Sequence, residues 1–160
     1  MATKSHVNTA PVNYLFSYRG FFMSKLVIKI KDNNFKSAHV VIIDNGKVLI
    51  LRRSQSDDWM PGHYGLPGGK LDGSERPQDA ASRECKEEVQ LIIEPQDLVF
   101  LPKVSIEKQH AFFYTTKFSG ELKLDFEHDD YKWINPKDLS NYKIIPDLSS
   151  TISAALEDLQ

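Results

Sequence analysis

Three glutamates fall within five consecutive residues of the sequence, and their spacing suits metal-assisted chemistry. Glu84, Glu87 and Glu88 stand at positions i, i+3 and i+4, so a helix would place their carboxylates on one arc of about 100°. Like charges at this spacing destabilise an isolated helix. A divalent cation such as Mg²⁺ prefers oxygen ligands and bridges to substrate phosphates, which makes the cluster a candidate metal site. A plain acidic helix face is the alternative that the spacing leaves open.

The loop that precedes these glutamates contains two adjacent glycines in Leu66-Pro67-Gly68-Gly69-Lys70. Glycines allow the backbone to approach a ligand closely, and a carbonyl there could complete a metal sphere, although adjacent glycines also occur in simple turns. Glu75 in the loop is spaced to pair with Arg83 in the helix, which would fix the loop to the helix. Arg83 could in addition hold the neighbouring Glu84 in its ionised form.

Loop and helix together resemble the Nudix box. Residues 69–91 are GKLDGSERPQDAASRECKEEVQL, and the box is G-x5-E-x7-R-E-U-x-E-E-x-G-U, where U is aliphatic. The positions that match its first glycine, its glutamates and its arginine are Gly69, Glu75, Arg83, Glu84, Glu87 and Glu88. The flanking segments Leu51-Arg52-Arg53 and Tyr131-Lys132-Trp133-Ile134 also look like MutT-type members. By this resemblance, which runs from Gly69 to Leu91, the chain is identified as a MutT-like member of the Nudix hydrolase family.

Gln90 departs from the family pattern, because the box has a glycine at this position. That glycine ends the helix in a left-handed conformation, where a residue with a Cβ costs on the order of 1 kcal/mol. We expect Gln90 to take the same conformation with some strain, and a helix that continues through it is the alternative. Cys85 occupies the aliphatic position of the box, and we expect it to pack in the core rather than to react.

The resemblance implies a role for each acid of the helix. Glu84 and Glu88 correspond to principal metal ligands, Glu87 to a ligand that binds directly or through water, and the Gly68 carbonyl to a further ligand. Glu84 is alternatively the base that activates water, a role that the family does not assign uniformly. The implied cofactor is Mg²⁺, or Mn²⁺ in its place.

A further acid is implied on a downstream loop. The candidates in Phe126-Glu127-His128-Asp129-Asp130 are its three acids, of which we favour Glu127, and a solvated acidic loop is the alternative. The catalytic candidates are therefore Glu84, Glu87 and Glu127. We expect His128 to be a loop or substrate-contact histidine rather than a metal ligand, because Mg²⁺ prefers oxygen.

The activity that the resemblance implies is a Mg²⁺-dependent pyrophosphohydrolase that cleaves a phosphoanhydride bond. Its substrate would be a small nucleotide, either a nucleoside triphosphate, which we favour, or a nucleoside diphosphate-linked compound. The cation would neutralise phosphate oxygens and acidify a water, and a carboxylate would take the water proton. An isomerase acting on an isoprenoid diphosphate and a non-catalytic nucleotide sensor are the alternatives, and the complete set of charges in the box favours hydrolysis.

Several basic and aromatic residues are candidates for holding the substrate. Arg52, Arg53 and Lys70 could bind phosphate charge, although surface solvation explains basic residues equally well. The aromatic candidates for stacking on a base are Trp59, Tyr64 and Phe113, although aromatic side chains more often belong to the core.

The composition narrows the class of protein further. The chain has 41% hydrophobic and 26% charged residues and a net charge of −2, which excludes fibrous and disordered classes and leaves no basic footprint for duplex nucleic acid. The single cysteine, Cys85, cannot form an intrachain disulfide, so we expect a cytoplasmic protein. No apolar run approaches the roughly 18 residues of a membrane helix, so we expect no membrane partner.

The elements that must position the site follow from periodicity and turn residues. We expect a helix from Pro77 to about Gln90, a C-terminal helix over 147–159, and a type I′ hairpin turn at Asn45-Gly46. The expected strands are 26–31, 36–43, 48–53, 98–106, 111–118 and 131–134.

This pattern predicts the α/β (α+β) class. With the resemblance it implies an α/β/α sandwich, in which a mixed sheet supports a catalytic loop-helix-loop and a C-terminal helix. We expect an N-terminal extension over residues 1–22 and a Nudix hydrolase domain over 23–160. The strand at 26–31 could serve as an interface, so a homodimer is one state open to the chain.

Overall fold

The computed structural model describes residues 35–160, and for 106–108 it describes the backbone alone. The extension over 1–22 and the strand expected at 26–31 lie outside the described residues. The strands are β1 (Ser37–Asp44), β2 (Lys47–Arg53), β3 (Tyr64–Gly65), β4 (Gly68–Lys70), β5 (Val99–Phe100), β6 (Ala111–Thr115) and β7 (His128–Ile134). The helices are α1 (Pro77–Val89), α2 (Pro102–Lys108) and α3 (Leu148–Leu159), with short 3-10 turns at Pro95–Asp97 and Pro136–Asn141.

The strands form a mixed sheet in the order β3-β2-β1-β6-β5, with β4 also paired to β1 and β7 to β2. Among the described strand pairs β1 and β6 run parallel, with Ala38 opposite Ala111, and an isolated parallel bridge joins Tyr64 of β3 to Ile144. The β1–β2 hairpin turns at Asn45 and Gly46, whose φ angles of 48° and 74° are those of the predicted type I′ turn.

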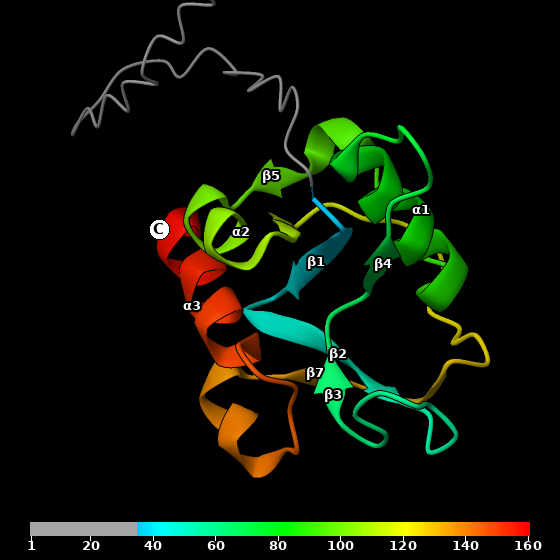
Figure 1. Ribbon diagram of the computed structural model, residues 1–160. Coiled ribbons are helices and arrows are strands. Elements are labelled where there is room, and N and C mark those ends of the chain that lie inside the picture. The colour runs from blue at the N-terminus through cyan, green and yellow to red at the C-terminus, as the bar shows by residue number, and fades with distance from the viewer. Residues whose placement is uncertain (1–34) are drawn as a thin grey trace, which may run out of the picture. The chain divides into compact units, whose positions relative to one another are not determined.

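The sheet lies between helices, as the sandwich prediction required (Figure 1). Successive residues of a strand face opposite sides of the sheet. Val41 and Ile43 of β1 pack with Leu148 and Ile152 of α3 in one buried cluster. The alternate residues of β1 therefore face α1, whose buried side chains include Ala81. The predicted α/β class and layered architecture are confirmed.

Helix α1 begins and ends where its sequence predicts. Pro77 occupies the first turn, where its missing N–H is harmless, and Gln90 follows the last helical residue with φ 57° and ψ 17°. The left-handed conformation expected at Gln90 is thus confirmed, and its N–H donates to the Lys86 carbonyl at 3.1 Å. Cys85 is fully buried, which confirms its packing role. Within the described part of the chain, no helix combines the length and apolar character needed to cross a membrane.

The strand predicted over 98–106 is wrong beyond its first residues. Strand β5 is only two residues long, and α2 begins at Pro102. Proline cannot donate to a strand ladder but fits the first turn of a helix. The buried Ser105 hydroxyl then donates to the Leu101 carbonyl at 2.7 Å and accepts from the Phe112 N–H at 2.8 Å. Short apolar runs such as this one do not distinguish helix from strand by period alone.

Two other strand boundaries also differ from the prediction. Strand β6 ends at Thr115 rather than at residue 118, and β7 begins at His128 rather than at residue 131. The Thr115 hydroxyl accepts from the Lys117 N–H at 3.0 Å, and this local turn ends the ladder.

Candidate active site

Glu88 is the buried acid of the glutamate cluster, with 6% of its surface exposed. Its Oε2 accepts a hydrogen bond from the Gly68 N–H at 2.8 Å, which joins α1 to the glycine loop. Burial raises the pKa of Glu88 to about 9, the Gly68 hydrogen bond opposes this, and nearby Glu84, Asp125 and Glu127 raise the pKa further. The side chains of Glu84, Glu88 and Asp125 are therefore largely withdrawn from solvent, whereas Glu127 is exposed beside them.

Glu84 lies between its neighbour Arg83 and the backbone of Gly69. Arg83 Nη1 donates to Glu84 Oε1 at 2.9 Å. Burial raises the pKa of Glu84, Arg83 lowers it, and the charges of Glu87 and Glu127 raise it. A Cβ at Gly69 would stand 2.5 Å from the carboxyl carbon of Glu84, so only glycine leaves room for this carboxylate.

Gly68 is confined by strand β1. It pairs with His39 in the antiparallel β1–β4 register, and its φ of 145° is a conformation that side chains rarely adopt. A Cβ there would stand 2.2 Å from the Ala38 carbonyl oxygen. The two adjacent glycines are therefore required for two separate reasons: a side chain at Gly68 would clash with strand β1, and a side chain at Gly69 would clash with Glu84 of α1.

Arg83 fixes the loop to the helix, as its spacing from Glu75 predicts. Its Nη2 donates to Glu75 Oε2 at 3.0 Å and to the Lys70 carbonyl at 3.0 Å, and its Nη1 donates to Glu87 Oε2 at 3.2 Å. The hydrogen bond from Arg83 lowers the pKa of Glu75, and the same bond raises the pKa of Arg83. This arrangement holds the start of the loop, its end and the helix in one network.

The loop after β6 reaches the end of α1 and brings two acids toward the cluster. The Asp125 N–H donates to the Glu88 carbonyl at 3.0 Å. The charges of Asp125 and Glu127 both act on Glu88, so both acids lie near the cluster. Sequence reasoning missed Asp125, because nothing in Leu124-Asp125-Phe126 distinguishes it from the other acids of this segment.

The other two acids considered for this role are engaged elsewhere. Asp129 accepts from Arg52 Nε at 2.6 Å, and Asp130 accepts from the Tyr64 hydroxyl at 2.6 Å. His128 is 8% exposed on β7, with its Nδ1 3.1 Å from Asp125 Oδ1. The loop position expected for His128 is therefore wrong, since it is a buried strand residue that contacts an acid of the cluster.

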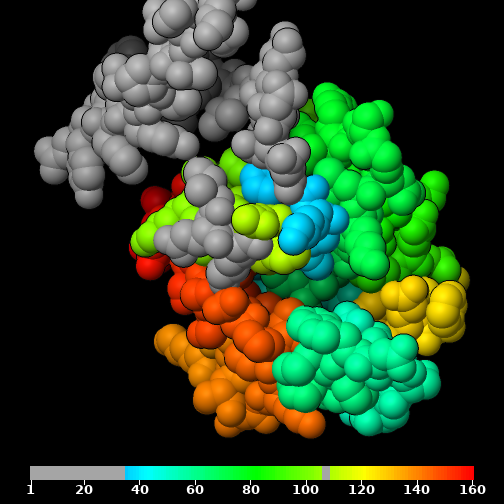
Figure 2. Space-filling view, viewed as in Figure 1, coloured from blue at the N-terminus to red at the C-terminus, as the bar shows by residue number. Residues whose placement is uncertain are grey.

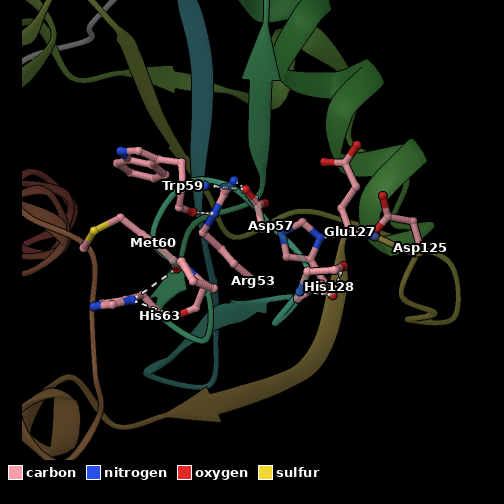
Figure 3. A network of polar contacts seen from close by, with 11 residues as sticks. Arg53, Asp57, Trp59, Met60, His63, Asp125, Glu127 and His128 are labelled. Atoms are coloured by element: carbon pink, nitrogen blue, oxygen red, sulfur yellow. Dashed lines mark hydrogen bonds and ion pairs between the residues drawn. The ribbon is translucent and has the colours of Figure 1, made fainter.

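The basic residues predicted to hold phosphate are dispersed. Arg53 donates to the Trp59 carbonyl at 2.8 Å and to Asp57 Oδ2, and its guanidinium lies 4.9 Å from the centre of the Trp59 ring. Figure 3 shows this network beside the Asp125–His128 segment. Arg52 is paired with Asp129, whereas Lys70 is exposed at the end of β4.

The three aromatic candidates differ in exposure. Phe113 is 2% exposed and belongs to the core, Tyr64 is 6% exposed with its hydroxyl bound to Asp130, and Trp59 is 53% exposed. Of the three, Trp59 alone presents its ring to solvent.

A second polar network lies on the other side of the glycine loop. The Ser37 hydroxyl is 2.7 Å from His39 Nε2 and 2.8 Å from His110 Nδ1, and the His39 ring stacks on Phe112 at 5.5 Å. Burial lowers the pKa of His39 to about 4, with further lowering by His110 and Arg53, so the imidazole is neutral at physiological pH. Sequence reasoning missed this group, because His110 lies 73 positions after Ser37 and meets it only through the β1–β6 pairing.

The donors of the cluster suit a hard divalent cation. Glu84, Glu87 and Glu88 on α1 offer oxygen atoms only, and their repulsion is relieved by positive charge. Among residues whose side chains are described, no group of three or more His, Cys, Asp or Glu side chains is arranged to hold a metal ion by itself. Mg²⁺ needs only one or two protein carboxylates, because it keeps several waters and binds substrate phosphates. The residues present therefore fit the cation.

Comparison with known proteins agrees with this geometry. The model of the NUDIX domain family matches residues 34–154, and the chain belongs to this family. It is 26% identical over 118 residues to the nucleoside triphosphatase NudI of Escherichia coli O139:H28, covering 65% of this chain and 84% of that protein. As the family and these relatives indicate, the chain is a Nudix hydrolase.

Solved structures share the fold. A MutT Nudix hydrolase from Burkholderia pseudomallei superposes with a TM-score of 0.61 at 23% identity, covering 74% of this chain and 95% of that one. A bifunctional NMN adenylyltransferase/ADP ribose pyrophosphatase from Francisella tularensis, solved with AMP and a Mn ion, gives a TM-score of 0.57 at 21% identity. It covers 79% of this chain and 42% of that one.

Proposed function

We propose that this hydrolase uses Mg²⁺ or Mn²⁺ to cleave a phosphoanhydride bond in a small nucleotide, either a nucleoside triphosphate or a nucleoside diphosphate-linked compound. The observation that carries the proposal is the buried Glu88 carboxyl, held by the Gly68 N–H and surrounded by Glu84, Asp125 and Glu127. Burying several acids together is costly unless a cation neutralises them. A reaction that requires a bound cation explains why these acids lie together despite their repulsion.

The proposed ligands are Glu84, Glu87, Glu88 and the Gly68 carbonyl. When bound, the cation supplies positive charge for the diphosphate oxygens and acidifies the attacking water. The hydrogen bond from Arg83 favours the ionised form of Glu84 and holds its carboxylate beside the Gly69 backbone. Gly69 leaves room for the Glu84 carboxylate, and Gly68 lets the loop lie close against β1 with its carbonyl available as a ligand.

We propose Glu127 as the acid that takes the proton from water. Among the described residues, no cation pairs with its carboxylate, whereas Arg83 binds Glu84. A carboxylate without a cationic partner is free to accept a hydrogen bond from water, whereas Glu84 already accepts one from Arg83. Its charge nevertheless acts on both Glu84 and Glu88, so it lies near enough to serve the same reacting phosphate.

Nucleoside triphosphates are the first substrates to test, and the activity named for the relative NudI supports this choice. The Mn ion in the Francisella tularensis structure supports a divalent cation. The lone buried Cys85 fits a reducing compartment such as the cytoplasm.

The test is a panel of nucleoside triphosphates and diphosphate-linked nucleotides, with phosphate and pyrophosphate release measured against added Mg²⁺. We expect hydrolysis of at least one compound, loss of activity with excess chelator, and recovery when the metal is restored. Undiminished hydrolysis in chelator would contradict the metal assignment. A panel without any hydrolysis would contradict the proposed function.

A further inference from the structure

A hollow of about 260 Å³ lies beside the acids of the active site. Its walls are Ser54, Ser56, Asp57, Asp58, Phe126 and Glu127. They come from two segments, the loop after β2 and the loop before β7, which lie next to each other at the surface beyond α1 (Figure 2). Because Glu127 also acts on Glu84 and Glu88, the hollow adjoins the place where the reacting phosphates would lie.

The walls of this hollow are held in position. The Ser54 N–H donates to the Glu127 carbonyl at 2.8 Å, which joins the two segments. Arg53 binds Asp57 Oδ2 and the Trp59 carbonyl, and Asp57 Oδ1 accepts from the Trp59 N–H at 2.9 Å. Figure 3 shows Arg53 between these groups, with Glu127 directed toward α1. The hollow is therefore formed before a ligand arrives, and Asp57 is part of its frame.

The lining is specific in its chemistry. Ser54 and Ser56 present hydroxyl groups 2.9 Å apart, and Asp58 and Glu127 present carboxylates that accept hydrogen bonds but repel anions. Phe126 is 89% exposed, so its ring offers an apolar face to whatever enters. A phosphate would be repelled here, whereas a neutral ring with many hydroxyl groups could donate to the carboxylates and rest its C–H face on Phe126.

We propose that this hollow is a subsite for a neutral, hydroxyl-rich ring carried by the diphosphate of the substrate. The inference rests on the proposed function, since it places the ring next to the reacting phosphates. Two parts of a nucleotide have this chemistry: the ribose of the nucleoside, and a sugar attached at the far end of a diphosphate. The terminal phosphate of a triphosphate does not have it, so a triphosphate would enter with its ribose in the hollow.

The test compares Phe126→Ala and Asp58→Ala with wild type on three compounds: a nucleoside triphosphate, its 2′,3′-dideoxy analogue, and a nucleoside diphosphate hexose. Loss of one hydrogen bond or of the stacking face should raise KM about three- to tenfold with kcat nearly unchanged. The matched controls, Leu159→Ala and Asp44→Asn, alter exposed residues of α3 and of the β1 end and should leave KM unchanged.

The pattern across substrates identifies the ring. A KM increase for the hexose compound alone assigns the subsite to the attached sugar. An increase in Asp58→Ala for the triphosphate but not for its dideoxy analogue assigns it to the ribose. Unchanged KM values for all three compounds in both variants would overturn the subsite, as would an equal increase for the triphosphate and its dideoxy analogue in Asp58→Ala.

A binding measurement distinguishes failure of this inference from failure of the proposed function. If wild type hydrolyses none of the compounds, the proposed function fails, and calorimetric titration with the nucleoside diphosphate hexose still tests the subsite. Weaker binding by Phe126→Ala than by Leu159→Ala supports the hollow as a ring site. Equal dissociation constants for the two variants would overturn it.

Discussion

Glu88 is buried and accepts a hydrogen bond from the backbone. Glutamine at this position keeps the shape of the side chain and removes its negative charge. The amide can still accept from the Gly68 N–H, but it offers a weaker oxygen ligand and no negative charge. We expect Glu88→Gln to lower turnover by about 10²–10⁴-fold in steady-state assays. The thermal midpoint in chelator should hold or rise, because a buried carboxyl among other acids has been replaced by a neutral group.

Glu94→Gln serves as the control for this substitution, since Glu94 is an exposed residue beyond α1. It should leave both turnover and the melting midpoint unchanged. Full activity in Glu88→Gln would show that the buried carboxyl plays no part in the reaction.

Gly69 offers a steric test of the same site. A Cβ at residue 69 would overlap the Glu84 carboxylate, which Arg83 holds in place. We expect Gly69→Ala to remain folded and to lose about 10- to 100-fold in turnover, because a displaced acid no longer meets the reacting phosphate in the right geometry. Circular dichroism and steady-state rates check the two parts of this expectation.

Gly73→Ala is the companion control, because a Cβ at residue 73 meets nothing within 4 Å. Because the φ of residue 73 is 54°, we expect alanine there to lower the stability somewhat, but the turnover per folded molecule should stay near that of wild type. Equal turnover in the two alanine variants would contradict the packing of Gly69 against Glu84.

His39 makes the stability of the fold sensitive to acid. The pKa of His39 in the folded chain, about 4, lies below the ordinary value of 6.5, so between these two pH values the unfolded chain binds a proton at His39 and the folded chain does not. The contribution of His39 to the free energy of unfolding is therefore fully present above pH 6.5 and is lost as the pH falls toward 4. We expect His39→Gln to show a shallower fall of the melting midpoint between pH 6.5 and pH 4. Parallel curves for variant and wild type would show that His39 does not contribute this dependence.

At the scale of single residues, the sequence predicts contacts between residues that lie close together along the chain. The ion pair of Glu75 with Arg83 could be predicted because the loop runs directly into the helix. Asp125 and the Ser37–His39–His110 group could not, because their neighbours are set by the sheet register and by the path of a long loop. Tertiary pairing of this kind leaves no periodic signal in the sequence.

The C-terminal end of α1 is the element that departs from the family pattern. Gln90 has φ 57°, which a side chain adopts at a cost of on the order of 1 kcal/mol relative to glycine. We expect Gln90→Gly to raise the free energy of unfolding by up to about 1 kcal/mol, measured by denaturant titration. Turnover should hardly change, because Gln90 is exposed and lies beyond the glutamates.

Lys86→Gly places the same residue at an exposed position inside α1, where glycine has poor helix propensity. We expect this variant to lose about 1 kcal/mol, opposite in sign to the variant at residue 90. A loss of stability in both variants would mean that the backbone at residue 90 does not require positive φ.

Among the elements, the helices with clear caps and the hairpin were predictable, whereas α2 was not. Pro77 and the Asn45-Gly46 turn act through local geometry that needs no partner. The 98–106 segment is apolar enough for strand or helix, and its fate depends on Leu101 and Val104 entering the core beside α3. Burial of those two side chains is a property of the assembled fold.

At the scale of the whole molecule, the described core lies between residues 35 and 160, and the family model begins at residue 34. We expect a chain that starts at Met23 to unfold cooperatively and to keep turnover within about twofold of the full chain. Differential scanning calorimetry and the hydrolysis assay measure the two properties. A broad, non-cooperative transition would show that residues 1–22 belong to the folding unit.

The parallel pairing of β1 with β6 has a consequence for synthesis on the ribosome. Ser37 meets His110, which lies 73 positions later in the chain. At roughly 5–20 residues per second, translation needs about 4–15 s to supply that partner. During this interval the Val40-Val41-Ile42 edge of the nascent hairpin has no neighbour on its β6 side. Unpaired apolar edges promote aggregation, so chaperones that bind nascent chains should act between the synthesis of β2 and that of β6.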